Sequence, residues 1–248
     1  MQLNKFLAFC GVASRRKANL PILEGRVAIN GEMVTTLGKT VDPEHDTVLL
    51  DGRPVVGPQR LRYILMNKPA GVITSAVDGR GRRTVLDLVP SSDRIFPVGR
   101  LDLDTEGVLL LTNDGELAYR LAHPKFEVDK IYRAWVEGDV TAQDLDHLAE
   151  GVQLTGDVCV SGEAKVLSRQ PGQTLVEIRL HEGKKRQIKR MMKAVGHPVI
   201  HLERTNFAGL TVPDLKSGTW RELTPDEVQQ LYRLVGLDPD DKVTGGMG

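Results

Sequence analysis

Three carboxylates occupy one short, glycine-flanked loop that leads into an apolar run. Asp102, Asp104 and Glu106 precede residues 108–111, which are all apolar. Loops held by rigid strands commonly carry chemistry. Carboxylates grouped in this way could bind a metal ion or act as an acid/base pair. They could also form an ordinary turn, in which Asp104 and Glu106 shape the backbone or pair with Arg100. The residue types alone leave these readings open.

Local clusters of basic residues lie behind a net charge of zero. The first is Lys5, Arg15, Arg16, Lys17 and Arg26; the second is Arg80, Arg82 and Arg83; the third is Lys184, Lys185, Arg186, Lys189, Arg190 and Lys193. Basic faces of this kind attract a polyanion even when the whole chain is neutral. For any one cluster alone, a solvated surface is the competing interpretation.

The flanking residues give the carboxylate loop a recognisable form. The sequence Gly-Arg-Leu-Asp-x-x-Thr-x-Gly at residues 99–107, followed by Leu-Leu-Leu-Thr-Asn-Asp-Gly, resembles the catalytic motif of the RsuA/RluB branch of pseudouridine synthases. Residues 67–71, 130–132 and 183–191 are similar to the other motifs of that family. Residues 15–17, with the turns near Gly25 and Asn30, resemble an S4 RNA-binding module. The motifs match in order and spacing over nearly the whole chain.

The resemblance implies a reaction and a set of catalytic residues. The family isomerises uridine: the N-glycosidic bond breaks, the uracil turns over, and C5 is joined to the ribose without a metal or cofactor. Asp102 matches the essential ionised aspartate, which could attack the sugar, attack the base or remove a ribose proton. Lys189 matches the basic residue that pairs with this aspartate and favours its charged form. Tyr132 matches the tyrosine that stacks on the base and could remove the C5 proton.

Further residues are expected around the bound nucleotide. Ile188 is expected to form an apolar wall opposite Tyr132, so that the two close a slot for a planar base. A uridine in folded RNA must leave its stack to enter such a slot. Arg100, Leu101 and Arg186 are expected to contact the substrate. The residues of the first two basic clusters, together with Lys184, Lys185 and Arg190 of the third, are expected to contact phosphates, which would position the RNA without reading its sequence.

The expected partner is ribosomal RNA or a ribosome-assembly particle. The resemblance favours the large-subunit branch, which acts on 23S RNA near the peptidyl transferase centre, over the 16S branch. A non-catalytic ribosome-assembly protein is a rival, but it predicts loss of Asp102, Tyr132 or the basic residue at 189, and all three are present. A carboxylate-based hydrolase or a metal enzyme built on the acidic loop is a second rival. A monomer would suffice for the isomerisation.

The pattern of apolar residues predicts an α+β protein with two domains. Residues 1–56 are expected to form the S4 domain (an α-L motif), residues 57–61 a linker, and residues 62–236 the catalytic domain. Strands and helices mix without a βαβ rhythm, which favours a mainly antiparallel sheet; the resemblance implies that a cleft bisects it. Ser14 is expected to cap a second helix that Pro21 shortens. Residues 237–248 are expected to be disordered.

The composition indicates a soluble protein with an ordinary core. Apolar residues make up 40% of the chain and charged residues 27%. No apolar run approaches the roughly 18 residues that a membrane span needs. The two cysteines, Cys10 and Cys159, are weak evidence for a disulfide. His197 and His201 have a spacing seen in metal sites, but without a third convergent ligand we expect a structural role. A cytoplasmic location is the expectation.

Overall fold

The chain folds into two compact units. The computed structural model describes residues 1–57, 60–75, 78–91, 93–154 and 160–238. The first unit comprises Met1–Arg62 with the short segments Ser91–Arg94 and Asn113–Gly115, and the second comprises the rest of the described chain. Among these residues no helix has the length and apolar character needed to cross a bilayer.

The N-terminal unit combines two short helices with a small sheet. Its elements are α1 (Leu3–Phe9), α2 (Asn19–Leu23), β1 (Val27–Ile29), β2 (Glu32–Val34), β3 (Val48–Leu50) and β4 (Arg53–Pro54). The antiparallel strands run in the order β2-β1-β3-β4. Leu3 and Leu7, one turn apart on α1, pack with Ile22 of α2 and Val27 of β1 in a single apolar core.

The second helix begins later than predicted, and this moves part of the first basic cluster. A helix capped by Ser14 was expected, whereas α2 begins at Asn19. Pro21 has no N–H to donate to the carbonyl of Lys17, so it is accommodated only in the first turn of a helix. The exposed residues 15–17 therefore lie in turns before α2. Pro54 pairs with Leu49 in the edge strand β4, so the sheet ends before the predicted linker of residues 57–61. Residues 58–59 of that linker lie outside the described chain.

The second unit is built on one bisected sheet. Its strands are β5 (Tyr63–Lys68), β6 (Phe96–Pro97), β7 (Thr105–Thr112), β8 (Lys130–Glu137), β9 (Glu163–Gln170), β10 (Gln173–Leu180), β11 (Val199–Phe207) and β12 (Trp220–Glu222). They follow the order β12-β5-β7-β11-β8-β10-β9, with β6 beside β7. All pairings are antiparallel except β7 with β11. The predicted α+β class, with a mainly antiparallel sheet, is confirmed.

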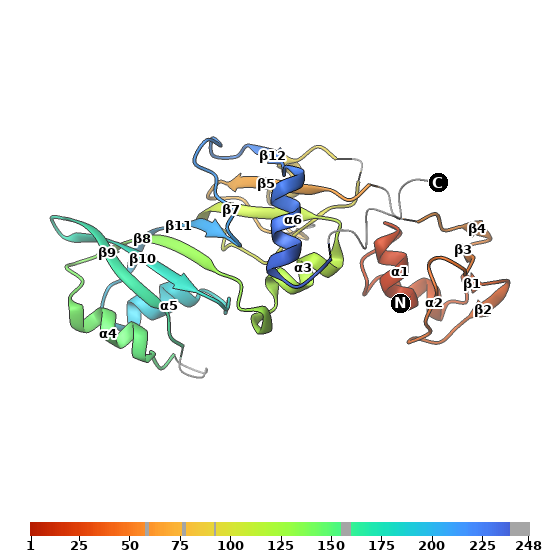
Figure 1. Cartoon of the computed structure of the whole chain (residues 1–248), viewed down its shortest axis with the longest axis horizontal. Coiled ribbons are helices and arrows are strands. Elements are labelled where there is room, and N and C mark those ends of the chain that lie inside the picture. The colour runs from red at the N-terminus through yellow and green to blue at the C-terminus, as the bar shows by residue number, and fades with distance from the viewer. Residues whose placement is uncertain (58–59, 76–77, 92, 155–159, 239–248) are drawn as a thin grey trace. The chain divides into compact units, whose positions relative to one another are not determined.

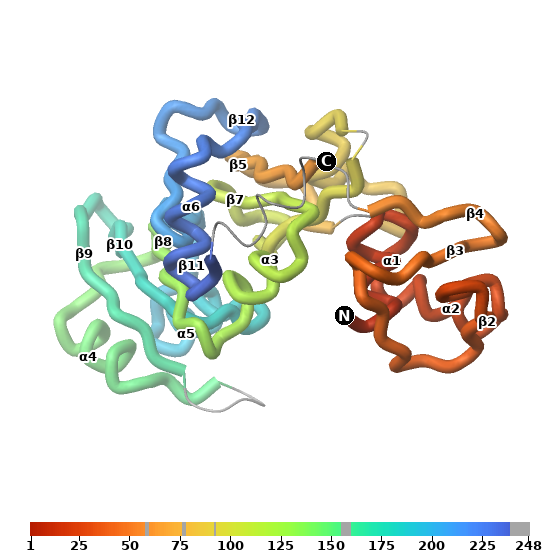
Figure 2. Tube along the Cα trace, turned by 45° about the vertical axis from the view of Figure 1, so that its right-hand side comes forward, coloured from red at the N-terminus to blue at the C-terminus, as the bar shows by residue number. Residues whose placement is uncertain are grey.

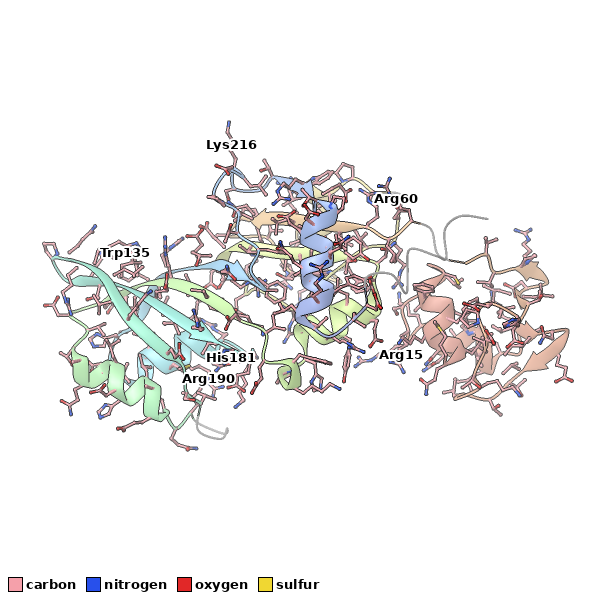
Figure 3. The ribbon with its side chains drawn as sticks, viewed as in Figure 1. Arg15, Arg60, Trp135, His181, Arg190 and Lys216 are labelled. Atoms are coloured by element: carbon pink, nitrogen blue, oxygen red, sulfur yellow. The ribbon has the colours of Figure 1, made fainter. Side chains whose placement is uncertain are left out.

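Helices cover the two halves of the sheet differently. The helices of this unit are η1 (Val85–Leu88), α3 (Gly115–Ala122), η2 (Pro124–Phe126), α4 (Ala142–Glu150), α5 (Gln187–Ala194) and α6 (Pro225–Leu234). Figures 1 and 2 show α3 and α6 on one side of β5 and β7, where they share an apolar core. Helices α4 and α5 pack on β8 and β10 with a second core. Trp135 lies on the side of the sheet away from α4 (Figure 3).

The parallel junction between the halves depends on a glycine. Only three residue pairs join β7 to β11, and Gly107 faces Arg204 in the last of them. A Cβ atom on Gly107 would lie 2.2 Å from the carbonyl oxygen of Arg204, and Gly107 has φ +101°. Both the close approach and the backbone conformation require glycine. The junction also brings the start of β7, just after the acidic loop, against the strand beside Tyr132.

Replacing Gly107 by alanine is expected to destabilise the catalytic unit by about 3–5 kcal/mol, because backbone strain and overpacking add. Urea unfolding followed by tryptophan fluorescence measures this unit, since the only two tryptophans, Trp135 and Trp220, lie in it. Gly209→Ala is the matched control, because Gly209 has φ +85° and open space around its Cβ position. That variant should lose about 1–2 kcal/mol. Equal losses would contradict the role assigned to the close approach.

Several strands were not foreseen from the sequence, and the tail is only partly visible. The edge strands β9 and β12 were missed, as was the two-residue strand β6.

Of the tail predicted to be disordered, residues 239–248 lie outside the described chain. Leu237 is described, and its N–H donates to the carbonyl of Tyr232 while its side chain packs against the core. The expectation of disorder from residue 237 was therefore wrong at that residue.

Candidate active site

The loop that carries Asp102 is held by a buried lysine. Lys68, at the end of β5, is fully buried, and its Nζ donates to the carbonyl oxygens of Pro69, Asp102, Leu103 and Thr105 at 3.0, 3.2, 3.5 and 2.8 Å. Burial lowers the pKa of this lysine from 10.5 to about 8, although the carboxylates of the loop oppose the shift. Three of these carbonyls, those of Asp102, Leu103 and Thr105, belong to the loop and the start of β7, so the lysine fixes the backbone that carries Asp102.

The seven predicted catalytic and substrate-binding residues all line one pocket of about 530 Å³ at the junction of the sheet halves. They are Asp102, Tyr132, Lys189, Arg100, Leu101, Ile188 and Arg186, and two predicted RNA-binding residues, Lys184 and Lys185, line it as well. Asp102 is half-buried there, whereas Arg100, Lys185 and Arg186 are exposed. The pocket is therefore apolar and enclosed in part, with cations exposed along its lining, an arrangement that suits a base attached to a phosphate backbone.

The apolar part of the pocket comes from three different elements. Tyr132 of β8 is 9% exposed, Ile188 of α5 is 4% exposed, and Leu101 of the acidic loop is 6% exposed. The backbone of Leu101 is fixed by Thr74, whose hydroxyl donates to its carbonyl at 2.8 Å and accepts from its N–H at 3.3 Å. These positions are compatible with the slot predicted for a planar base.

The three carboxylates predicted to share the loop have different surroundings, and Glu106 lies in β7, which begins at Thr105, rather than in the loop. Asp104 forms an ion pair with Lys189 at 2.5 Å, and Glu106 pairs with His201 at 3.0 Å. The pairing of Lys189 with Asp102, implied by the family resemblance, is therefore not the one in this structure, and neither Asp104 nor Glu106 is paired with Arg100 as suggested. The hydrogen bond from Lys189 lowers the pKa of Asp104. Asp104 is only two residues from Asp102 in the sequence, but its side chain is 61% exposed.

The segment before α5 is braced so that Ile188 and Lys189 reach the pocket. The side-chain amide of Gln187 donates to Glu182 at 3.0 Å, and its oxygen accepts from the N–H of Lys184 at 2.9 Å. Arg186 has φ +52°, a left-handed conformation that turns the chain into the helix. Gln187 is itself buried, so the brace is shielded from water.

Other predicted RNA-binding residues lie outside the pocket. Arg190 is on α5, and Arg80, Arg82 and Arg83 precede η1. The guanidinium of Arg82 is held by Asp78 at 2.9 Å. In the N-terminal unit, Arg15, labelled in Figure 3, donates to Gln2, whereas Arg26 is paired with Asp51 and Glu24 at 2.6 and 3.2 Å. Lys5 of α1 is half-buried, and Arg16 and Lys17 are exposed. Ion pairs thus occupy the guanidinium groups of Arg26 and Arg82.

Three polar residues of the pocket were not predicted as site residues, although Thr105 and Lys130 lie within the motifs at residues 99–107 and 130–132. Arg204 of β11, Lys130 of β8 and Thr105 of β7 line it and are 2%, 7% and 2% exposed. The sequence could have indicated Lys130, because it lies two residues before Tyr132 in the same strand and its side chain therefore points to the same, inward face. The two histidines are accounted for by local pairs: His197 contacts Asp144 at 3.2 Å, and His201 contacts Glu106. In the described part of the chain, no group of three or more possible metal ligands was found.

The mixed, mainly antiparallel sheet thus carries an aspartate loop, a buried tyrosine and a lysine around one pocket. Residues 62–194 match the RNA pseudouridylate synthase family, and residues 1–55 match the S4 domain. The chain belongs to the RNA pseudouridylate synthase family and is an enzyme of the isomerase class, as predicted.

Known relatives extend this similarity over the whole chain. An RNA pseudouridine synthase of Aquifex aeolicus is 46% identical over 241 residues, which cover 96% of each chain. The ribosomal large subunit pseudouridine synthase B of Bacillus subtilis is 44% identical over 236 residues, covering 94% of this chain and 96% of that protein. A crystal structure of a pseudouridylate synthase superimposes with a TM-score of 0.67 at 29% identity, covering 93% of this chain and 99% of the other.

Proposed function

We propose that this enzyme converts a uridine of 23S ribosomal RNA to pseudouridine, with Asp102 as the essential carboxylate. The observation that carries the chemistry is the single pocket lined by Asp102, Tyr132 and Lys189. The large-subunit target is supported by the name of the Bacillus subtilis relative, which is similar over nearly its full length. The S4 domain match supports an RNA substrate.

Each pocket residue has a role that its position supports. Tyr132 and Ile188 are nearly buried, so they would hold a flipped-out uracil between apolar surfaces and exclude water. Asp102 is half-buried and lines the pocket, whereas Asp104 is mostly exposed. Lys189 is paired with Asp104 in this structure. Its positive charge would favour the ionised form of any carboxylate that it approaches, including that of Asp102.

RNA affinity would come from cations at the surface rather than from the catalytic residues. Lys185 and Arg186 are exposed at the pocket, and residues 15–17 are exposed in the N-terminal unit. Contacts of this kind bind phosphates, weaken steeply with salt and carry little sequence information. The choice of uridine would then depend on the shape of the RNA around it.

The test is pseudouridine mapping by carbodiimide treatment and primer extension. Unmodified 23S and 16S transcripts, and the corresponding assembly particles, are incubated with the full chain or with heat-inactivated protein. We expect one new stop in 23S RNA and none in 16S RNA. A stop only in 16S RNA would overturn the target but keep the reaction. No stop in either RNA would overturn the proposed ribosomal substrate.

A further inference from the structure

The floor of the pocket contains two buried cations and no buried carboxylate among its described lining residues. Arg204 and Lys130 are 2% and 7% exposed, while the lining carboxylates, Asp102 and Glu182, are only half-buried. A buried charge is costly unless it is paired. The floor therefore holds an excess of positive charge that the roles proposed above do not use.

The two cations lie together under the position expected for the base. Arg204 is the register partner of Tyr132 across β11 and β8. Lys130 precedes Tyr132 by two residues on β8, so both side chains point to the same face of the sheet. The guanidinium carbon of Arg204 lies 4.7 Å from the centre of the Phe207 ring, and the Lys130 ammonium lies 6.0 Å from the same centre. Both cations therefore lie close to the same aromatic ring.

The guanidinium of Arg204 is incompletely satisfied. Its Nε donates to the carbonyl of Val108 at 2.8 Å, but its Nη2 has no hydrogen-bond partner among the described residues. The hydroxyl of Thr105, which also lines the pocket, is buried without a partner in the same part of the chain. Lys130 donates to the carbonyls of Val128 and His181 at 2.9 and 3.0 Å. Buried polar groups left in this state call for an explanation.

We infer that Arg204 and Lys130 stabilise the negative charge that develops on the uracil when its glycosidic bond breaks. This inference rests on the function proposed above. When the C1′–N1 bond breaks, its electron pair stays with the uracil and is delocalised over N1, O2 and O4. C5 then forms the new bond to C1′, the C5 proton leaves, and N1 gains a proton. No oxidant or reductant is needed, and the uracil is anionic only between the two bonds.

The depth of the cations favours this role over phosphate binding. The phosphates of the RNA can be met by Lys185 and Arg186, which are exposed at the pocket. The buried pair can be approached only by a group that has left water, such as the extruded base. Fixed cations in a site from which water is excluded stabilise developing charge more strongly than solvent does. A burial-lowered pKa of about 8 for Lys130 agrees with a positive floor that lacks an anion before the substrate is bound.

The experiment compares two leaving groups in the full-length enzyme. The target RNA is prepared with either uridine or 5-fluorouridine at the modified position, because fluorine withdraws electrons and makes the uracil a better leaving group. Cleavage of the original nucleoside is followed under single-turnover conditions by nuclease digestion and mass spectrometry. The variants are Arg204→Met and the charge-preserving Arg204→Lys. Arg221→Met is the matched control, since Arg221 lies on β12, pairs with Glu227 of α6 and does not line the pocket.

Arg204→Met is expected to slow cleavage of uridine by about 10²-fold to 10³-fold, as for loss of one charge-stabilising donor. On 5-fluorouridine the loss should be about tenfold smaller, because less stabilisation is needed. Arg204→Lys should recover part of the rate, and Arg221→Met should change neither rate. Equal losses on the two substrates would overturn the inference and indicate a structural role. If Arg204→Met does not fold, Lys130→Met gives the same comparison, because it removes the charge of the other buried cation. A wild-type enzyme inactive on uridine would instead refute the proposed function.

Discussion

Asp102→Asn should abolish pseudouridine formation while leaving RNA binding intact. Asparagine keeps the size of the side chain but removes the charge that attack or proton abstraction requires. We expect the single-turnover rate to fall by about 10⁴-fold or more, as for loss of an essential catalytic group. RNA affinity at fixed salt should change by no more than about threefold, because phosphate contacts dominate it. Pseudouridine is measured by mass spectrometry and affinity by filter binding.

Asp104→Asn is the matched control, since it makes the same change two residues away in the same loop. Asp104 is 61% exposed and is the partner of Lys189. Its loss should release Lys189 without removing the reactive carboxylate, so we expect a rate loss of about tenfold or less, in the range of a partly exposed ion pair. If Asp104→Asn is the inactive variant and Asp102→Asn is not, the essential carboxylate is Asp104. Lys189 would then be the partner of the essential carboxylate through the ion pair with Asp104 that the structure contains.

The sequence predicted the main elements where their side chains repeat with a clear period. The strand β8 alternates buried and more exposed residues along its whole length, and this pattern predicts a strand over residues 131–136, one residue short of the observed strand at each end. The strand β9 was missed because most of its residues are exposed, so it lacks an apolar alternation. The three-residue strand β12 carries too few residues for a pattern. Edge strands are specified largely by their neighbours, which a single sequence does not reveal.

The site was predicted unevenly for a different reason. Asp102, Tyr132 and Ile188 fall in motifs, and the fold brings them to one pocket. Which carboxylate accepts Lys189 depends on the path of the loop, because Asp102 and Asp104 are only two residues apart. The buried roles of Lys68 and Arg204 were not anticipated, since a lysine or arginine in a strand ordinarily indicates a solvent-facing position. Burial of a charge is a property of the assembled sheet.

Lys68→Met should both destabilise the catalytic unit and slow catalysis. Methionine has a similar length but cannot donate to the four carbonyls that Lys68 now contacts, three of which belong to the loop and the start of β7. We expect the free energy of unfolding to fall by about 2–4 kcal/mol, because buried acceptors lose their partner. The rate should fall by about 10²-fold as Asp102 loses its fixed position. Lys216→Met is the control, since Lys216 is exposed at a loop (Figure 3) and should change neither quantity.

The dependence of stability on pH separates this role of Lys68 from general loss of packing. The pKa of Lys68 is about 8 in the folded protein and 10.5 for an ordinary lysine, because burial disfavours the charged form. Between these values the folded state has released a proton that the unfolded chain still holds. The free energy of unfolding of the wild type should therefore rise with pH, relative to Lys68→Met, from about pH 8 to 10.5, and the difference should be constant below that range. Urea unfolding followed by tryptophan fluorescence at several pH values measures the difference. A difference that stays flat up to pH 10.5 would mean that Lys68 is not buried as a cation beneath the loop.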